Sequence, residues 1–266
     1  MKPLIVFFFV AIILIFFFWL GLQIKPRPFT MINLPQAENT TVQLPENLPE
    51  PVIRFYETVF KDQVPVIDTV VIIGRGRMRP FGIWLPTRFV MIHNAGRDYR
   101  HYFEATFFGL PFLKVNEGYV DGKSFFESPM GTYYDDPNTN QGANLALWAE
   151  GGWFPSLWVT DPRARWQAVD ENTAILYVPF GDKEENFIVR FNPKTGLVDK
   201  MEAMRYRAKT DQEKILWITN DVMSDNKPTI SYATWLDIGK PWLALSIDDI
   251  QFNLDVSELI LTRGYE

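Results

Sequence analysis

The chain has 266 residues, a net charge of −6 at pH 7 and no cysteine, which excludes disulfides, zinc–thiolate sites and thiol nucleophiles. Its charge is uneven: residues 74–101 carry six arginines against one aspartate, and the remainder is acidic. A mildly acidic body with one cationic band is not typical of a nucleic-acid-binding protein, whose binding face is basic. We therefore expect no nucleic acid among its partners.

The first predicted element is a charge-free apolar run over residues 4–22. As a helix rising ~1.5 Å per residue, this run nearly spans the ~30 Å hydrocarbon core of a bilayer. A cleaved signal peptide is the competing interpretation. Its apolar region is usually ~7–15 residues long and ends in small residues, whereas this run continues into residues 23–26, Gln-Ile-Lys-Pro. We expect residues 1–24 to form an uncleaved, single-pass transmembrane anchor.

The positive charges beside this run do not decide its orientation. Lys2 flanks one end and Lys25 and Arg27 flank the other, so the positive-inside rule gives a near tie. A very short N-terminal head is usually retained while the long domain is exported. We therefore expect an extracytoplasmic domain at a bacterial inner membrane, with membrane lipid as a partner.

Residues 25–47 are predicted to be a stalk. Prolines at positions 26, 28, 35 and 45 break any helix, so this segment should be extended and poorly packed. Residues 48–266 then form a single β-rich domain, which is long enough to bury a sizeable core.

Two helices are expected in this domain. Residues 50–60 place Val52, Phe55 and Val59 at helical spacing, and Pro51 suits a first turn. Residues 140–150 are rich in alanine and leucine and are followed by two glycines. Both helices should cover a sheet.

The remaining pattern predicts strands, because β-branched and aromatic residues alternate with polar ones between turn residues. We expect about ten strands, within residues 64–74, 81–92, 99–109, 111–120, 165–169, 174–180, 186–191, 197–208, 214–222, 229–236 and 242–252. Short connections favour an antiparallel meander, and so long a sheet must curl. The expected fold is mainly β (α+β), with a large curved antiparallel sheet or half-barrel and two covering helices.

Most of residues 48–252 resembles a known group of proteins. The most specific elements are Ala149-Glu150-x-x-Trp153-Phe154-Pro155 and Trp166-x-x-Val169-Asp170. They resemble a bacterial membrane-anchored family classed only as a domain of unknown function. The resemblance implies no catalytic residue. It implies a β-rich outline similar to the lipoprotein-carrier (LolA/LolB-like) curved sheets, which cradle acyl chains.

The arginine band, which we define as Arg75, Arg77 and Arg79, is the first candidate binding site. On a strand these three side chains project from one face, where they could meet anionic lipid head groups. The alternative is a solvated strand face, or ion pairs with Asp135, Asp136, Asp248 and Asp249.

Glu150 lies close in sequence to Trp153 and Phe154, and this group is the second candidate. A carboxylate among large apolar rings would be desolvated, which would raise its pKa as in many active sites. Alternatively, Glu150 accepts hydrogen bonds from the turn at residues 151–152 or pairs with an arginine of the band.

Two further patterns are weaker. Asp136, Asn138 and Asn140 open like a calcium loop, but the sixth and twelfth positions do not fit, so a turn and helix cap is preferred. His93 and His101 are the only histidines, and no hydrolase, metalloprotease or nucleotide-binding motif accompanies them. We therefore expect no catalytic residue, metal or cofactor.

The many aromatic residues, among them Trp84, either fill the core or line an apolar pocket within the curved sheet. We predict a non-catalytic, membrane-anchored binding module for a lipid or other amphiphile. One alternative is a scaffold that docks onto a membrane-protein complex, and another is a hydrolase using Glu150 or a histidine. An enclosed apolar cavity would favour the carrier over the scaffold. The expected ligand-binding residues are Arg75, Arg77, Arg79, Trp84, Glu150, Trp153 and Phe154.

Overall fold

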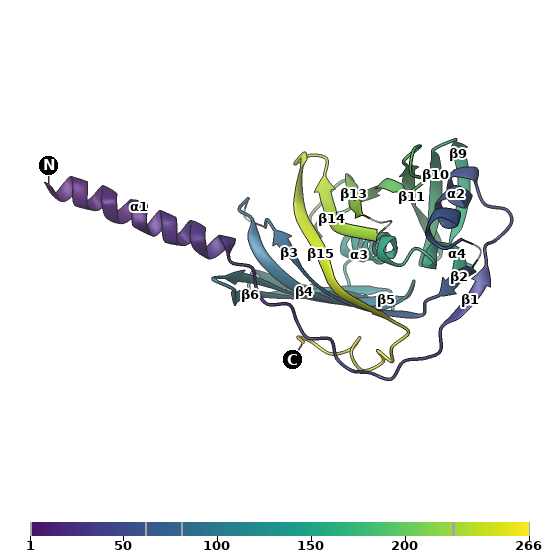
Figure 1. Cartoon of the computed structure of the whole chain (residues 1–266), viewed down its shortest axis with the longest axis horizontal. Coiled ribbons are helices and arrows are strands. Elements are labelled where there is room, and N and C mark those ends of the chain that lie inside the picture. Colours follow the sequence, from purple (N-terminus) through teal and green to yellow (C-terminus); the bar gives the residue numbers. More distant parts are fainter. Residues whose placement is uncertain (1, 62, 81, 225–226, 266) are drawn as a thin grey trace.

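The computed structural model describes residues 2–61, 63–80, 82–224 and 227–265. A rod-like helix, α1 (Lys2–Gln23), projects from a body in which one large curved sheet surrounds the main helices (Figure 1). The predicted fold class, a curved antiparallel sheet covered by helices, is confirmed.

The large sheet has 13 strands, all paired antiparallel, in the spatial order β8-β7-β6-β5-β4-β3-β15-β14-β13-β12-β11-β10-β9. The prediction of about ten strands missed the short hairpin formed by β7 and β8. The strands are β3 (Thr69–Met78), β4 (Leu85–Asn94), β5 (Asp98–Phe107), β6 (Leu110–Val120), β7 (Lys123–Ser128), β8 (Gly131–Tyr134), β9 (Arg165–Asp170), β10 (Thr173–Phe180), β11 (Lys183–Phe191), β12 (Val198–Arg205), β13 (Ile215–Ser224), β14 (Lys227–Trp235) and β15 (Lys240–Phe252).

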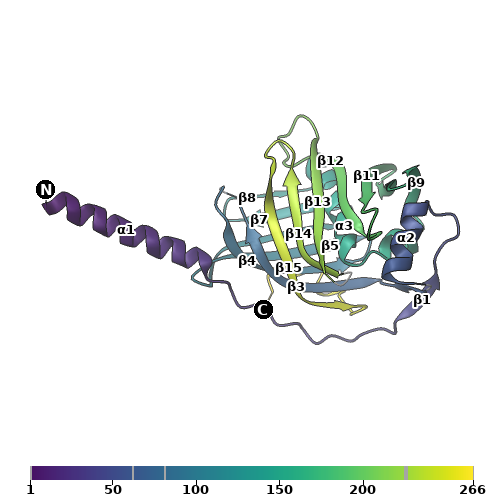
Figure 2. The ribbon, with the colours of Figure 1, turned by 45° about the horizontal axis from the view of Figure 1, so that its top comes forward.

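The strand order differs from a simple meander in one respect. β3, the first strand of the large sheet, pairs with β15, the last, in the middle of the sheet (Figure 2). The two edges are β8 and β9, which flank the helical segment of the chain. Each half of the sheet is therefore a meander, and the segment between them leaves the sheet to fill its hollow.

The concave face of the sheet carries the main core. On β11 the alternation is clear, because Phe187, Val189 and Phe191 are buried while Ile188 and Arg190 are exposed, as predicted. Four helical segments cover this face: α2 (Glu50–Val59), α3 (Pro137–Ala149), the 3₁₀ turn η1 (Glu150–Trp153) and α4 (Leu157–Thr160).

Both predicted helices are present. α2 buries Val52, Phe55 and Tyr56 against the core. α3 begins three residues earlier than expected, because the Asp136 carboxylate caps it by accepting the backbone N–H groups of Asn138 and Thr139. This contact confirms the helix-cap interpretation of that acidic segment.

The predicted stalk is extended and mostly exposed, as expected, but part of it packs against the body. Its residues Phe29, Met31 and Leu34 join a second apolar cluster on the convex face of the sheet. The C-terminal tail lies on the same face, where Val256 and others cover outward-facing residues of β3 and β4. Further on, β1 (Thr40–Gln43) pairs with β2 (Gln63–Val66). Isolated apolar residues within a proline-rich sequence gave little indication of this second layer.

Arg100 anchors the C-terminal tail to the convex face. This side chain is 1% exposed and donates to the carbonyl oxygens of Leu259 and Gly264, both at 2.8 Å. Burial lowers its pKa to about 10, so it remains charged at neutral pH.

We expect Arg100→Met to lower the free energy of unfolding by about 1–3 kcal/mol, because two buried charge-assisted hydrogen bonds are lost while the aliphatic stem is kept. Urea unfolding followed by circular dichroism measures this change, and faster hydrogen exchange in residues 254–265 would locate it. Arg97→Met, at an exposed arginine nearby in sequence, is the control. Equal stability of the two variants would contradict the anchoring role.

α1 exposes most of its apolar side chains and is the one described helix that is long and apolar enough to cross a membrane. A signal sequence near the N-terminus would satisfy the same criteria of length and composition. The end of α1 is attached to the β5–β6 hairpin, because the backbone N–H of Phe108 donates to the carbonyl of Gly21 at 3.0 Å. Gly21 allows this close approach, since a Cβ at this position would displace the ring of Phe107.

Candidate functional site

A cavity of about 710 Å³ lies between the concave face of the sheet and the helices. Its volume falls within the ~300–1,000 Å³ range of small-molecule sites. Most of its wall is aromatic or aliphatic, including Phe55, Phe103, Trp153, Phe154, Trp158, Met201, Trp217, Trp242 and Leu245. A smaller polar part of the wall is formed by His101, Glu117, Glu150, Arg205 and Asp221.

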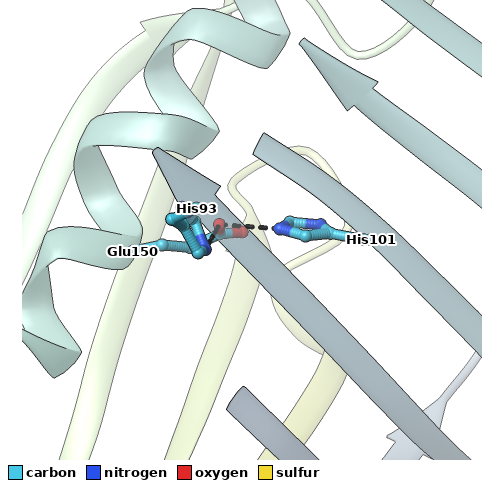
Figure 3. A group of neighbouring side chains, drawn as sticks. All are labelled: His93, His101 and Glu150. Atoms are coloured by element: carbon cyan, nitrogen blue, oxygen red, sulfur yellow. Dashed lines mark ion pairs between the residues drawn. The ribbon is translucent and has the colours of Figure 1, made fainter. Parts of the chain in front are cut away.

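Three side chains converge at this polar wall: His93, His101 and Glu150 (Figure 3). His93 on β4 and His101 on β5 point to the concave face from diagonal positions, because His93 pairs with Tyr99 and His101 with Met91. Glu150 follows the last turn of α3 and reaches between the two rings. The pairing of two strands and the end of one helix therefore create the cluster.

The distances within the cluster are short. Oε2 of Glu150 lies 3.2 Å from Nε2 of His93 and 2.9 Å from Nε2 of His101. These are ion-pair distances, but among the described residues none of these three atoms has a partner with hydrogen-bond geometry. On the other side of the His101 ring, Nδ1 lies 3.3 Å from Oε1 of Glu117, its cross-strand neighbour on β6. Glu117 therefore orients His101 toward Glu150.

Burial and charge act against each other in this cluster. For His101, burial lowers the pKa, but the carboxylates of Glu150 and Glu117 outweigh it and raise the pKa to about 9. For His93, burial dominates and the pKa is lowered. For Glu150, burial raises the pKa, but the two imidazoles have the larger, opposite effect and lower the pKa to about 2. The stable charge arrangement without other ligands is an ionised Glu150 beside a protonated His101.

The interpretation of Glu150 as an acid with a raised pKa, one of the two considered from the sequence, is therefore wrong. Its apolar neighbours are present, since Phe154 lies with its ring centroid 5.3 Å from that of His93. However, the ion-pair partners of Glu150 are the two histidines. In the described structure no arginine of the band forms an ion pair with it. The two histidines reach it only through strand pairing, which the sequence near Glu150 does not indicate.

Arg205 and Asp221, two further residues with charged groups, line the same cavity. The guanidinium of Arg205, on β12, stacks 4.3 Å over the ring of Trp217, and its Nε has no hydrogen-bond partner in the described part of the chain. Asp221 on β13 has a pKa raised by burial, which its hydrogen bond with Ser231 only partly offsets. The cavity thus also offers a guanidinium and a carboxyl group beside its apolar wall.

The arginine band lies on the opposite face of the sheet. Arg75 forms a bidentate ion pair with Asp248 at 2.6 and 2.8 Å, one of the pairings considered from the sequence. Arg77 donates to Gln23 at the end of α1, and Arg79 donates to the carbonyl of Pro241 and stacks on Trp84. The outward neighbours on β3, Val71 and Ile73, belong to the convex cluster.

The structure thus divides the predicted ligand-binding residues into two groups. Glu150, Trp153 and Phe154 line the cavity, whereas the arginine band and Trp84 do not. The two groups therefore do not form one binding site, although both were expected to bind the ligand. The sequence did not identify Glu117 and Arg205 as site residues, because only the pairing of distant strands places them there.

Comparisons with known proteins agree with a β-rich family without an assigned activity. A family model described as a family of unknown function, DUF6544, matches residues 38–231. A comparison with curated proteins finds no match to this sequence.

Three solved structures are similar in broad outline. A LolA superfamily protein from Nitrosomonas europaea is 9% identical, with a TM-score of 0.47 over 80% of this chain and 96% of the other. A DUF1329 family protein from Desulfovibrio piger is 9% identical, with a TM-score of 0.43 over 80% and 95%. A Vibrio parahaemolyticus domain described as an outer-membrane lipoprotein-sorting protein is 10% identical, with a TM-score of 0.39 over 79% and 92%. With TM-scores below 0.5, these likenesses say nothing about the ligand of this chain.

Proposed function

This chain belongs to the family of unknown function DUF6544, as its resemblance predicted, and from its own cavity we propose that it binds a lipid or other amphiphile without transforming it. The observation that carries the proposal is the 710 Å³ cavity between sheet and helices. A scaffold that only docks onto other proteins has no need of such a space, because cores are normally filled to high density.

The chemistry of the wall supports an amphiphile in particular. Aromatic and aliphatic side chains form most of the lining, which suits an acyl chain or another apolar group. Arg205 presents a cation at the same wall, with Nε unpartnered within the described structure, and could receive an anionic or polar head. In this proposal the head group meets Arg205 rather than the arginine band.

We further propose that α1 anchors the protein in a membrane, with the body held beside the lipid surface. The length of α1, its exposed apolar side chains and its attachment to the β5–β6 hairpin support this role. The hairpin itself exposes Phe108, Leu110 and Phe112 next to the end of α1, where they could enter the interfacial region of the bilayer. An extracytoplasmic body at the bacterial inner membrane remains part of the proposal.

A hydrolase is the second candidate. A hydrolase that uses Glu150 or a histidine needs a cleft in which that side chain meets another titratable group, and the cluster of Glu150, His101 and Glu117 offers such contacts. The hypothesis of a protein-docking scaffold has less support. The arginine band and the exposed β5–β6 hairpin are the surfaces that a membrane-protein partner could bind.

Native mass spectrometry of the full chain, released from detergent micelles, tests the main proposal. We expect a population that carries one tightly bound amphiphile, because a ligand seated in the apolar cavity should survive removal of the micelle. Lipid extraction of the same sample should then identify it. A chain that appears only at its bare mass, from membranes and from added phospholipid alike, would contradict the proposal.

A further inference from the structure

The cluster at the polar wall has the composition of a metal site. We propose that His93, His101 and Glu150 bind one divalent first-row transition-metal ion, such as Zn²⁺ or Fe²⁺, in the wall of the cavity. This inference stands on the three side chains themselves and does not depend on amphiphile binding.

The spacing of the donor atoms supports a shared ion. The nitrogen and oxygen donors of the three residues all lie within 4.8 Å of one another, and two of the separations are 2.9 and 3.2 Å. Two bonds of ~2.0–2.2 Å that meet at a metal at ~90–110° place their donor atoms about 3–3.5 Å apart. The two separations from Glu150 to the histidines match this range, while the two imidazole nitrogens lie within 4.8 Å of each other.

The orientation of the donors is the second argument. Nε2 of His93, Nε2 of His101 and Oε2 of Glu150 are buried, and within the described chain none has a partner in hydrogen-bond geometry. Buried polar atoms normally find such a partner. These three buried atoms are gathered within 4.8 Å, at ion-pair distances but without hydrogen-bond geometry, and a cation shared by all three would account for this arrangement.

Glu117 supplies the outer contact that metal-binding histidines commonly make. Its Oε1 lies 3.3 Å from Nδ1 of His101. When Nδ1 carries the proton and donates it to this carboxylate, Nε2 presents its lone pair toward Glu150. His93 has no corresponding partner, because its Nδ1 is also unbonded among the described residues.

The surroundings suit an ion with open coordination positions. Glu150 follows the C-terminus of α3, and the negative end of the helix dipole favours a positive charge nearby. His101 and Glu150 line the cavity, so positions not taken by protein would face it. Two histidines and one carboxylate with open positions are ligands of catalytic Zn²⁺ and of non-haem Fe²⁺.

The competing explanation is an ion-pair network in which a protonated His101 lies between two carboxylates. This network would need no metal. Metal binding measured on the full chain in detergent separates the two explanations, because only a metal site retains one ion per chain after chelation, reloading and dialysis.

We expect the wild-type chain, stripped with a chelator and reloaded with Zn²⁺, to retain about one zinc per chain by elemental analysis. His93→Ala and His101→Ala should abolish this binding. Glu117→Gln should weaken it by roughly 10–100-fold, as loss of such outer contacts does elsewhere. Glu202→Gln is the matched control and should bind as the wild type does, because Glu202 is another buried, ion-paired glutamate that lies outside the cavity.

X-ray absorption of the zinc-loaded wild type tests the site without any variant, so the result does not depend on whether a variant folds. We expect first-shell scattering from nitrogen and oxygen together with the outer-shell signature of two imidazoles. Wild-type protein that retains no zinc, or a bound zinc without imidazole scattering, would overturn the proposal. Zinc retained equally by a folded His93→Ala variant would do the same.

Discussion

Trp158→Ala should lower the free energy of unfolding by about 3–5 kcal/mol, the range for removing a fully buried aromatic side chain. Trp158 is 1% exposed and lies on α4, between the core and the cavity. Its indole N–H donates to the carbonyl of Trp148 at 2.9 Å, and its own carbonyl accepts from the indole of Trp166 at 3.1 Å. Because domains are usually stable by only ~5–15 kcal/mol, this loss is a large fraction of the total.

Close packing between Gly151 and the indole of Trp158 explains part of the expected loss of stability. An added Cβ at Gly151 would lie 2.5 Å from Nε1 of Trp158, so backbone and indole are in direct contact. Alanine at position 158 leaves a void that the rigid turn cannot close. Urea unfolding followed by far-ultraviolet circular dichroism measures the loss. Trp158→Phe, which keeps an aromatic ring but removes the N–H donor, should cost only about 1–2 kcal/mol. An alanine variant as stable as the phenylalanine variant would refute this account.

Ala233→Phe should reduce amphiphile binding by at least about tenfold, which corresponds to ~1.4 kcal/mol. Ala233 lies on the concave side of β14 and lines the cavity. A phenyl ring at this position occupies space that the ligand needs. Overpacking itself should lower stability by only about 1–3 kcal/mol, so the variant should still fold.

The measurement is displacement of a dansyl-labelled medium-chain fatty acid from the full chain in detergent. Ile230→Phe is the control, because position 230 lies on the same strand but is exposed on the other face of the sheet. We expect this control to bind the probe like the wild type. Equal loss of binding in both variants, or no loss in either, would count against the cavity as the binding site.

The sequence predicted those features that depend on local pattern. Alternation on β11 and helical spacing in α2 identified the elements and the faces they bury. The acidic cap of α3 was also predicted, because an aspartate before a helix satisfies backbone groups a few residues away. Each of these depends on residues close together in the chain.

The site could not be predicted in the same way, because its members come from distant segments. His93 and His101 are eight residues apart and could be read as two unrelated residues, while Glu150 reaches them only because the segment after β8 enters the hollow of the sheet. A register shift of one residue on β4 would turn His93 to the convex face. For the arginine band, the sequence correctly predicted that the side chains share one face. It did not indicate where this face lies relative to the cavity, because that depends on the pairing of β3 with β15.

The seam between β3 and β15 also has a consequence for the order in which the molecule assembles. Residues joined across it lie far apart in sequence, as in the hydrogen bond from Ser246 to the carbonyl of Arg75, which spans 171 positions. Such non-local pairing slows folding, because a long loop must close, at an entropic cost, before the stabilising contacts can form. During synthesis the two meanders can each form early, but they can join only after the final strand has left the ribosome. The cavity between them is therefore a late product of folding, and a chain truncated before β15 would have two half-sheets that no strand pairing joins.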